Sequence, residues 1–214
     1  MFAFGYIFML PLPPKPLRRN GFSPHRSRGR RLAHFLAPAF AVVLVCGAAT
    51  AAVWPIDGSR SRAHFSVRTL WFTHERGEFQ AVHGELRQID ARHDAVDAWI
   101  DTASLSMDDE DALNEATGPG FFDVANFPRI HFASTPFAAE ALRDGGALEG
   151  TLELHGLKRD ARFQLEPSQC PAQPLTCPVR VKGTLSRSAF GMRAHRGWLS
   201  DRVSLEMNIV LGPS

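Results

Sequence analysis

The chain has 214 residues, a formal net charge of +2, 44% hydrophobic and 21% charged residues. This content of apolar side chains excludes a disordered chain, and three cysteines are too few for a scaffold built from disulfides. The length predicts one domain, or two small ones. The charge is uneven, because residues 1–51 contain seven Lys and Arg and no Asp or Glu. Residues 52–214 therefore carry a formal charge of −5.

The first 51 residues have the layout of a secretory signal peptide. The basic run Arg26-Ser27-Arg28-Gly29-Arg30-Arg31 precedes residues 36–52, which contain no charged side chain and end in small residues. Ala49-Thr50-Ala51 matches the A-x-A pattern and predicts cleavage after Ala51 or Ala52. Two alternatives stay open. A basic segment could bind nucleic acid, although it lacks interleaved aromatic side chains, and the apolar stretch could be kept as a membrane anchor.

Residues 52–214 form the predicted domain, and their apolar and polar side chains alternate with a period of two. In chain order, the runs lie at residues 65–67, 96–100, 148–154, 161–165, 179–185 and 203–211. Turn signals separate them at Asp57-Gly58-Ser59, Asp144-Gly145-Gly146, His155-Gly156 and residues 171–178. A strand with one buried face and one solvent-exposed face is typical of antiparallel sheets. About eight strands are expected, enough to close an all-β, extended antiparallel barrel without exposed edges.

One short helix is predicted at residues 108–116. Its four acids, Asp108, Asp109, Glu110 and Asp111, lie in the first turn, where the helix dipole favours negative charge. A metal site at these acids is the alternative to a solvated helix start.

Cys170 and Cys177 remain after removal of the signal peptide, on either side of a turn-rich loop. In an exported protein they predict a disulfide, which would contribute about 2 kcal/mol because the closed loop is small. Two free thiols are the alternative.

No catalytic motif is present. The seven histidines of residues 52–214 lack the spacing of metal ligands, and the chain has no G-x-S-x-G, P-loop or dinucleotide fingerprint. The sequence therefore predicts neither an enzyme nor a metal site, although a Ser-His-Asp triad assembled in space is not excluded.

The interior of an eight-stranded barrel is either filled by its own side chains or holds one small ligand. Aromatic side chains are numerous on the expected strands and beside the barrel ends: Phe65, Phe79, Trp99, Phe121, Phe122, Phe132, Phe163 and Phe190. Aromatic rings fit both a solid core and a ligand pocket, so the pattern alone does not decide between them.

A series of short segments follows in order along essentially all of residues 53–212: Trp54-Pro-Ile-Asp57, Phe65-Ser-Val67, Gly77-Glu-Phe79 with Gly84, Ile100-Asp101 with Ser104-Leu105, Phe121-Phe-Asp-Val124, Phe127-Pro-Arg-Ile-His-Phe-Ala-Ser134, Gly150-Thr-Leu-Glu-Leu-His-Gly156, Arg187-Ser-Ala-Phe-Gly191 and Asp201-Arg-Val203. Taken together, this series resembles the YceI-like family. The resemblance implies a lipocalin-like barrel in the bacterial periplasm that binds a polyisoprenoid or similar long amphiphilic lipid in its lumen. The resemblance implies no catalytic residue.

The alternation assigns side chains to such a lumen. The expected lining residues are Phe65, Val67, Phe79, Ile100, Phe132, Leu152, Leu154, Phe163 and Leu185, with Phe121, Phe122 and Phe190 at the barrel ends. A shift of one residue in the register of a strand would exchange its inward and outward side chains, so that every lining residue predicted on that strand would face outward.

The favoured hypothesis is therefore a carrier, store or stress-related scavenger of an isoprenoid-type lipid, including a quinone. The alternatives are an accessory module of a membrane electron-transport system and a lipid-modifying enzyme. No cofactor is expected besides the bound lipid. The expected partner is an apolar or amphiphilic lipid, with no nucleic acid and no membrane span after signal cleavage, and a homodimer is left open.

Overall fold

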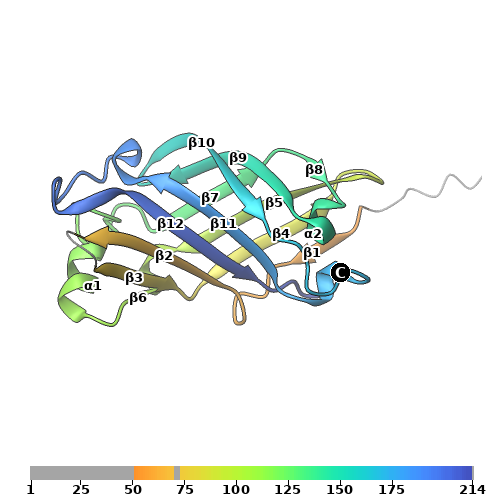
Figure 1. The fold of residues 1–214 in the computed structure, drawn as a ribbon, viewed down its shortest axis with the longest axis horizontal. Coiled ribbons are helices and arrows are strands. Elements are labelled where there is room, and N and C mark those ends of the chain that lie inside the picture. Colours follow the sequence, from red (N-terminus) through yellow and green to blue (C-terminus); the bar gives the residue numbers. More distant parts are fainter. Residues whose placement is uncertain (1–50, 70–72, 214) are drawn as a thin grey trace, which may run out of the picture. The chain divides into compact units, whose positions relative to one another are not determined.

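The computed structural model describes residues 51–69 and 73–213. These residues form a twelve-stranded antiparallel sheet curled around a common interior (Figure 1). The strands are β1 (Val53–Pro55), β2 (Arg62–Thr69), β3 (His74–Phe79), β4 (Val82–Gln88), β5 (His93–Asp101), β6 (Leu105–Ser106), β7 (Arg129–Ser134), β8 (Phe137–Ala138), β9 (Gly146–Leu154), β10 (Leu157–Leu165), β11 (Val179–Ser186) and β12 (Leu199–Ile209). The helices are α1 (Glu110–Thr117), α2 (Ala141–Asp144) and the 3₁₀ turns η1 (Thr102–Ser104), η2 (Pro174–Thr176) and η3 (Arg187–Phe190).

The predicted antiparallel β-barrel class is confirmed, and the strand count is higher than the expected eight for a simple reason. β3 runs into β4 after Gln80 and Ala81, and β5 runs into β6 through η1. Across this bend, β4 pairs with β5 and β6 pairs with β3. β3 and β4 are thus the two halves of one bent segment, and β5 and β6 are the two halves of another. With the short β1 and β8 set aside, eight segments wind around the described domain, in the order β2, β3–β4, β5–β6, β7, β9, β10, β11 and β12.

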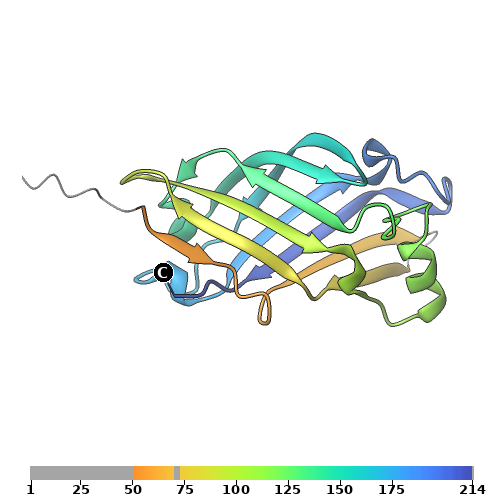
Figure 2. The same ribbon diagram turned by 180° about the vertical axis from the view of Figure 1, so that it is seen from behind.

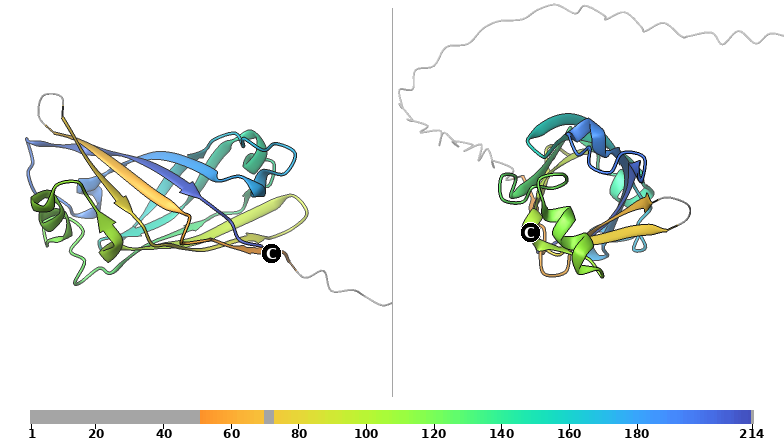
Figure 3. Two further views of the ribbon diagram at one scale, coloured as in Figure 1. Left: turned by 90° about the horizontal axis from the view of Figure 1, so that it is seen from below. Right: turned by 90° about the vertical axis from the view of Figure 1, so that its left-hand side faces the viewer.

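The first and last parts of the domain lie side by side. β12 pairs with β2, so the last strand of the domain joins the second one. The short β1 pairs with β4 along one edge, and the Gly212 amide donates to the Pro55 carbonyl at 2.7 Å on the other side. Figure 2 shows β1, in orange, beside β4, in yellow, with β5 on the far side of β4. Viewed end-on in Figure 3, the strands follow one another around a ring, with α1 at one end. These contacts pair backbone groups that an open sheet would leave exposed.

The period-two pattern predicts the two faces of the strands correctly. On β9, Leu148, Leu152 and Leu154 are buried, whereas Glu149 and Thr151 are exposed. The same division holds on β10, where Ala161, Phe163 and Leu165 are buried between exposed polar neighbours. Each strand therefore presents one apolar face to the inside of the barrel.

Two glycines on inner faces make room for aromatic rings. Phe65 lies opposite Gly77, and Phe163 lies opposite Gly183. A Cβ atom at either glycine would collide with the facing ring. The rings therefore lie flat along the wall of the barrel, over backbone that carries no side chain.

The helix predicted at residues 108–116 is observed as α1, shifted toward the C-terminus. Asp109 is its N-cap, and its carboxylate accepts a hydrogen bond from the Ala112 amide at 2.7 Å. Asp108 precedes the helix, while Glu110 and Asp111 lie in the first turn. Within the described ranges, no group of three or more His, Cys, Asp or Glu side chains is placed to hold a metal ion. The acids begin a solvated helix.

Cys170 and Cys177 form the predicted disulfide, with their Cα atoms 5.8 Å apart. It closes the loop that contains η2. Of the helices that the structure describes, none has the length and apolar character needed to span a membrane. The predicted signal peptide lies almost entirely outside the described residues, so its cleavage stays a prediction.

Candidate functional site

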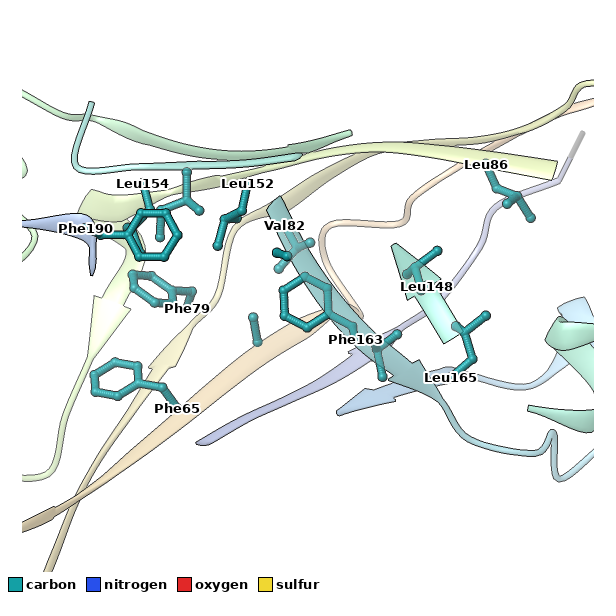
Figure 4. Packing of buried hydrophobic residues seen from close by; sticks show 14 of the residues in the cluster. Phe65, Phe79, Val82, Leu86, Leu148, Leu152, Leu154, Phe163, Leu165 and Phe190 are labelled. Carbon is teal, nitrogen blue, oxygen red and sulfur yellow. The ribbon is translucent and has the colours of Figure 1, made fainter. Parts of the chain in front are cut away.

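One cavity of about 820 Å³ runs through the interior of the barrel. Its walls are the inner faces of strands from around the ring, and Figure 4 shows several of the side chains that converge on it. Its volume lies within the range of small-molecule pockets, roughly 300–1,000 Å³. The barrel is therefore hollow, which decides the question that the aromatic content left open.

All nine predicted lumen residues line this cavity: Phe65, Val67, Phe79, Ile100, Phe132, Leu152, Leu154, Phe163 and Leu185. Phe121 and Phe122, predicted at the barrel ends, also line it. Phe190 does not. It lies in η3 at the end of β11, only 2% exposed, and packs within the hydrophobic cluster instead. Whether the lining side chains touch a lipid stays a prediction.

The aromatic side chains gather in two groups along the wall. Phe65, Phe79 and Phe122 contact one another, with ring centroids 5.2–5.9 Å apart. Phe132 and Phe163 form a second pair at 5.1 Å with nearly perpendicular rings. These tilted and edge-to-face arrangements are the favourable ones for aromatic rings. The rings of each group therefore pack against one another on the wall of the cavity.

The two ends of the cavity differ in chemistry. Toward α2 the lining is apolar: Ile56, Leu86, Phe137, Leu142, Leu148, Leu165, Val179 and Leu211. Apart from His64, the polar lining side chains come from the end at α1: Thr69, Glu75, Asp111, Glu115, Arg187 and His195. Trp198, which is 70% exposed, also borders that end. The α1 end is therefore the polar mouth, and the α2 end is an apolar terminus.

Arg187 anchors the segment that forms part of this mouth. Its side chain is 4% exposed, and its guanidinium donates to four backbone carbonyls, those of Met192, Ala194, Leu199 and Ser200, at 2.6–3.0 Å. Burial lowers the pKa of Arg187 from its usual value, and the Asp201 charge opposes that shift. The N–H groups of this arginine therefore donate to backbone carbonyls of the protein, and these hydrogen bonds hold residues 192–200 against η3.

A second contact ties the same segment to α1. His195 Nε2 is hydrogen-bonded to the Glu115 carboxylate, and the imidazole stacks on Phe121 with centroids 6.0 Å apart. His195 has a φ of 52°, in the left-handed region that non-glycine residues seldom adopt. The helix, Phe121 and the segment of residues 192–200 thus meet around the mouth.

Sequence reasoning missed most of these polar residues. Glu75 could have been found, because period two places it on the same face of β3 as Phe79. Arg187 lies in the segment Arg187-Ser-Ala-Phe-Gly191, but nothing local predicts that its guanidinium turns back onto carbonyls up to 13 residues away. The Glu115–His195 pair joins residues 80 positions apart, so only the fold brings them together.

The architecture is that of a hollow antiparallel barrel with an apolar interior and one polar end. The family model of the YceI-like domain matches residues 54–211. The chain therefore belongs to the YceI-like family. No curated protein matches it in sequence.

Several solved structures share the fold. A polyisoprenoid binding domain from Saccharophagus degradans is 13% identical, covers 77% of this chain and 100% of its own, and has a TM-score of 0.57. BcnA of Burkholderia cenocepacia is 18% identical, covers 74% of this chain and 99% of its own, and has a TM-score of 0.60. The Campylobacter jejuni YceI protein is 17% identical, and the match covers 69% of this chain and 90% of the Campylobacter chain, with a TM-score of 0.50. At these identities the likeness establishes the fold alone.

Proposed function

We propose that this protein binds one long-chain amphiphilic lipid, a polyisoprenoid or a molecule of similar shape, inside the barrel. The observation that carries the proposal is the cavity of about 820 Å³ inside the barrel, with an apolar terminus and a polar mouth. A chain buried there leaves water, which stabilises the complex by about 0.8 kcal/mol for each CH₂ group. The polar mouth would then receive the head group.

Membership of the YceI-like family supports this proposal, as does the likeness to a domain described as polyisoprenoid-binding. We place the protein in the periplasm, as a carrier, store or scavenger. The predicted signal peptide and the Cys170–Cys177 disulfide, a bond typical of oxidising compartments, support this location.

The experiment is recovery of the lipid that accompanies the protein. Residues 52–214, exported and purified without detergent, are extracted with organic solvent, and the extract is analysed by mass spectrometry. We expect one class of long-chain amphiphile in about one-to-one ratio with protein. A quinone would favour the accessory role in electron transport over simple storage.

A matched pair of variants makes the result specific to the cavity. Ala98 lines the cavity on β5, whereas Ala133 on β7 lies opposite the outward Asp97. Ala98→Phe should abolish lipid recovery because the ring fills the lumen, and Ala133→Phe should leave it unchanged. Thermal unfolding checks that both variants fold, because overpacking costs about 1–3 kcal/mol. Repeated preparations without lipid, together with no uptake of added polyprenol, would refute the proposal.

A further inference from the structure

One charged side chain, that of Glu75, lies on the inner wall of the barrel. Strand β3 pairs with β2 so that Phe79 faces Ala63, Gly77 faces Phe65 and Glu75 faces Val67. Ala63, Phe65 and Val67 are all buried, which makes this the inner side of the sheet. Glu75 therefore shares the face of Phe79 and lines the cavity near its mouth.

Within the part of the chain that the structure describes, Glu75 makes no hydrogen bond or ion pair with another side chain. Glu78, three residues along the same strand, behaves differently: it points outward and pairs with Arg62 at 3.2 Å and His64 at 3.4 Å. A half-buried carboxylate without a partner loses part of its hydration and recovers nothing from the protein. A polar group of a bound ligand would supply the missing partner.

The other charged groups at the mouth do not change this picture. The Arg187 guanidinium donates to four backbone carbonyls, and His195 is bonded to Glu115. Asp111 borders the same opening from the first turn of α1 and adds a further negative charge. Among the described side chains that line the mouth, a head group thus meets carboxylates and no cation without a partner; Arg193 and Arg196, on the segment of residues 192–200, do not line the cavity.

We infer that Glu75 is the head-group acceptor of the cavity. The site then selects an amphiphile whose head group donates a hydrogen bond and carries no negative charge, such as an alcohol, amide or amine. It discriminates against carboxylates and phosphates, because their charge would be repelled in a partly dehydrated site. The inference rests on the proposed function, since it assumes that the lumen holds the ligand's chain.

The test uses three ligands with the same chain and different head groups: octadecylamine, octadecanol and octadecanoic acid. Each displaces the neutral fluorescent probe N-phenyl-1-naphthylamine from the delipidated protein at neutral pH and low salt, at concentrations below self-association. We expect the amine and the alcohol to displace the probe at concentrations about tenfold lower than the acid. Added NaCl should reduce the difference between amine and acid.

Glu75→Gln keeps the size of the side chain and removes its charge. It should weaken binding of the amine and strengthen that of the acid, bringing the two within about threefold of each other. Glu78→Gln, on the outer face of the same strand, is the matched control and should keep the wild-type order. Glu75→Leu provides a second variant in case Glu75→Gln does not fold, and it should also abolish the preference.

Equal affinity of the wild type for the acid and the alcohol would overturn the inference, as would the same response in Glu75→Gln and Glu78→Gln. Failure of all three ligands to displace the probe would overturn the proposed function and this inference with it. Binding of all three without discrimination would leave the proposed function standing and remove only the role of Glu75.

Discussion

The buried carboxyl group of Asp94 lowers the stability of the folded protein at neutral pH. It lies at the start of β5 and is 5% exposed, and its carboxylate accepts no hydrogen bond from the described residues. Burial raises the pKa of Asp94 above its usual 3.8, the negative charges of Asp90 and Glu140 add to this effect, and His93 opposes it. The folded state therefore holds the Asp94 proton more tightly than the unfolded chain does.

The sign of the resulting pH dependence is clear. The stability that protonated Asp94 contributes is fully present below pH 3.8 and is lost as the pH rises through the raised pKa of the folded state. Asp94→Asn should therefore stabilise the protein at neutral pH by about 1 kcal/mol, which corresponds to about 2–4 °C in Tm. The advantage should disappear in acid. Thermal unfolding at both pH values measures it.

Asp97→Asn is the control, because Asp97 points outward and bonds His131 at 2.9 Å. It should bring no gain in Tm at neutral pH. A lower Tm for Asp94→Asn at neutral pH would show that the Asp94 carboxylate has a stabilising partner, contrary to our expectation.

At the scale of an element, the segment of residues 192–200 depends on one side chain. Arg187→Met removes the donors to four carbonyls and should destabilise the protein by about 2–4 kcal/mol, because buried acceptors are left without partners. Limited proteolysis should cut the segment faster, and urea unfolding should give a lower midpoint.

Arg193→Met tests the same chemistry at an exposed position of the same segment. It should change stability by less than about 0.5 kcal/mol. Equal effects of the two substitutions would mean that the carbonyls find other donors when Arg187 is removed.

For the whole molecule, the length of the cavity should set the length of the ligand. Val179 lines the apolar terminus on β11. Val179→Phe should shorten the lumen there, so that long alcohols bind at least about fivefold more weakly while short ones keep their affinity, since each excluded CH₂ forfeits about 0.8 kcal/mol.

Val53→Phe, on the 38%-exposed position of β1, is the matched substitution outside the barrel. It should leave the chain-length profile unchanged. Probe displacement by a series of straight-chain alcohols measures both variants, and an equal loss at every length in Val179→Phe would argue against a linear tunnel.

The alternation of side chains along the chain was enough to assign faces, because consecutive residues of a strand point to opposite sides wherever the strand lies. It placed Phe163 and Leu152 on the inner wall correctly. The same alternation also indicates that Glu75 points inward, because Glu75 lies on the same face of β3 as Phe79. The helix at residues 108–116 and the disulfide between Cys170 and Cys177 were likewise predictable from local signals.

The tertiary structure alone decided which of these inner faces enclose empty space. A cavity depends on how many strands close the ring and on how facing side chains meet across it, and both relate residues far apart in the chain. The bend between β3 and β4, the exclusion of Phe190 from the lining and the anchoring of residues 192–200 by Arg187 have the same origin. Local pattern determined which side chains point inward, whereas long-range pairing determined that the barrel is hollow and that its polar mouth lies at α1.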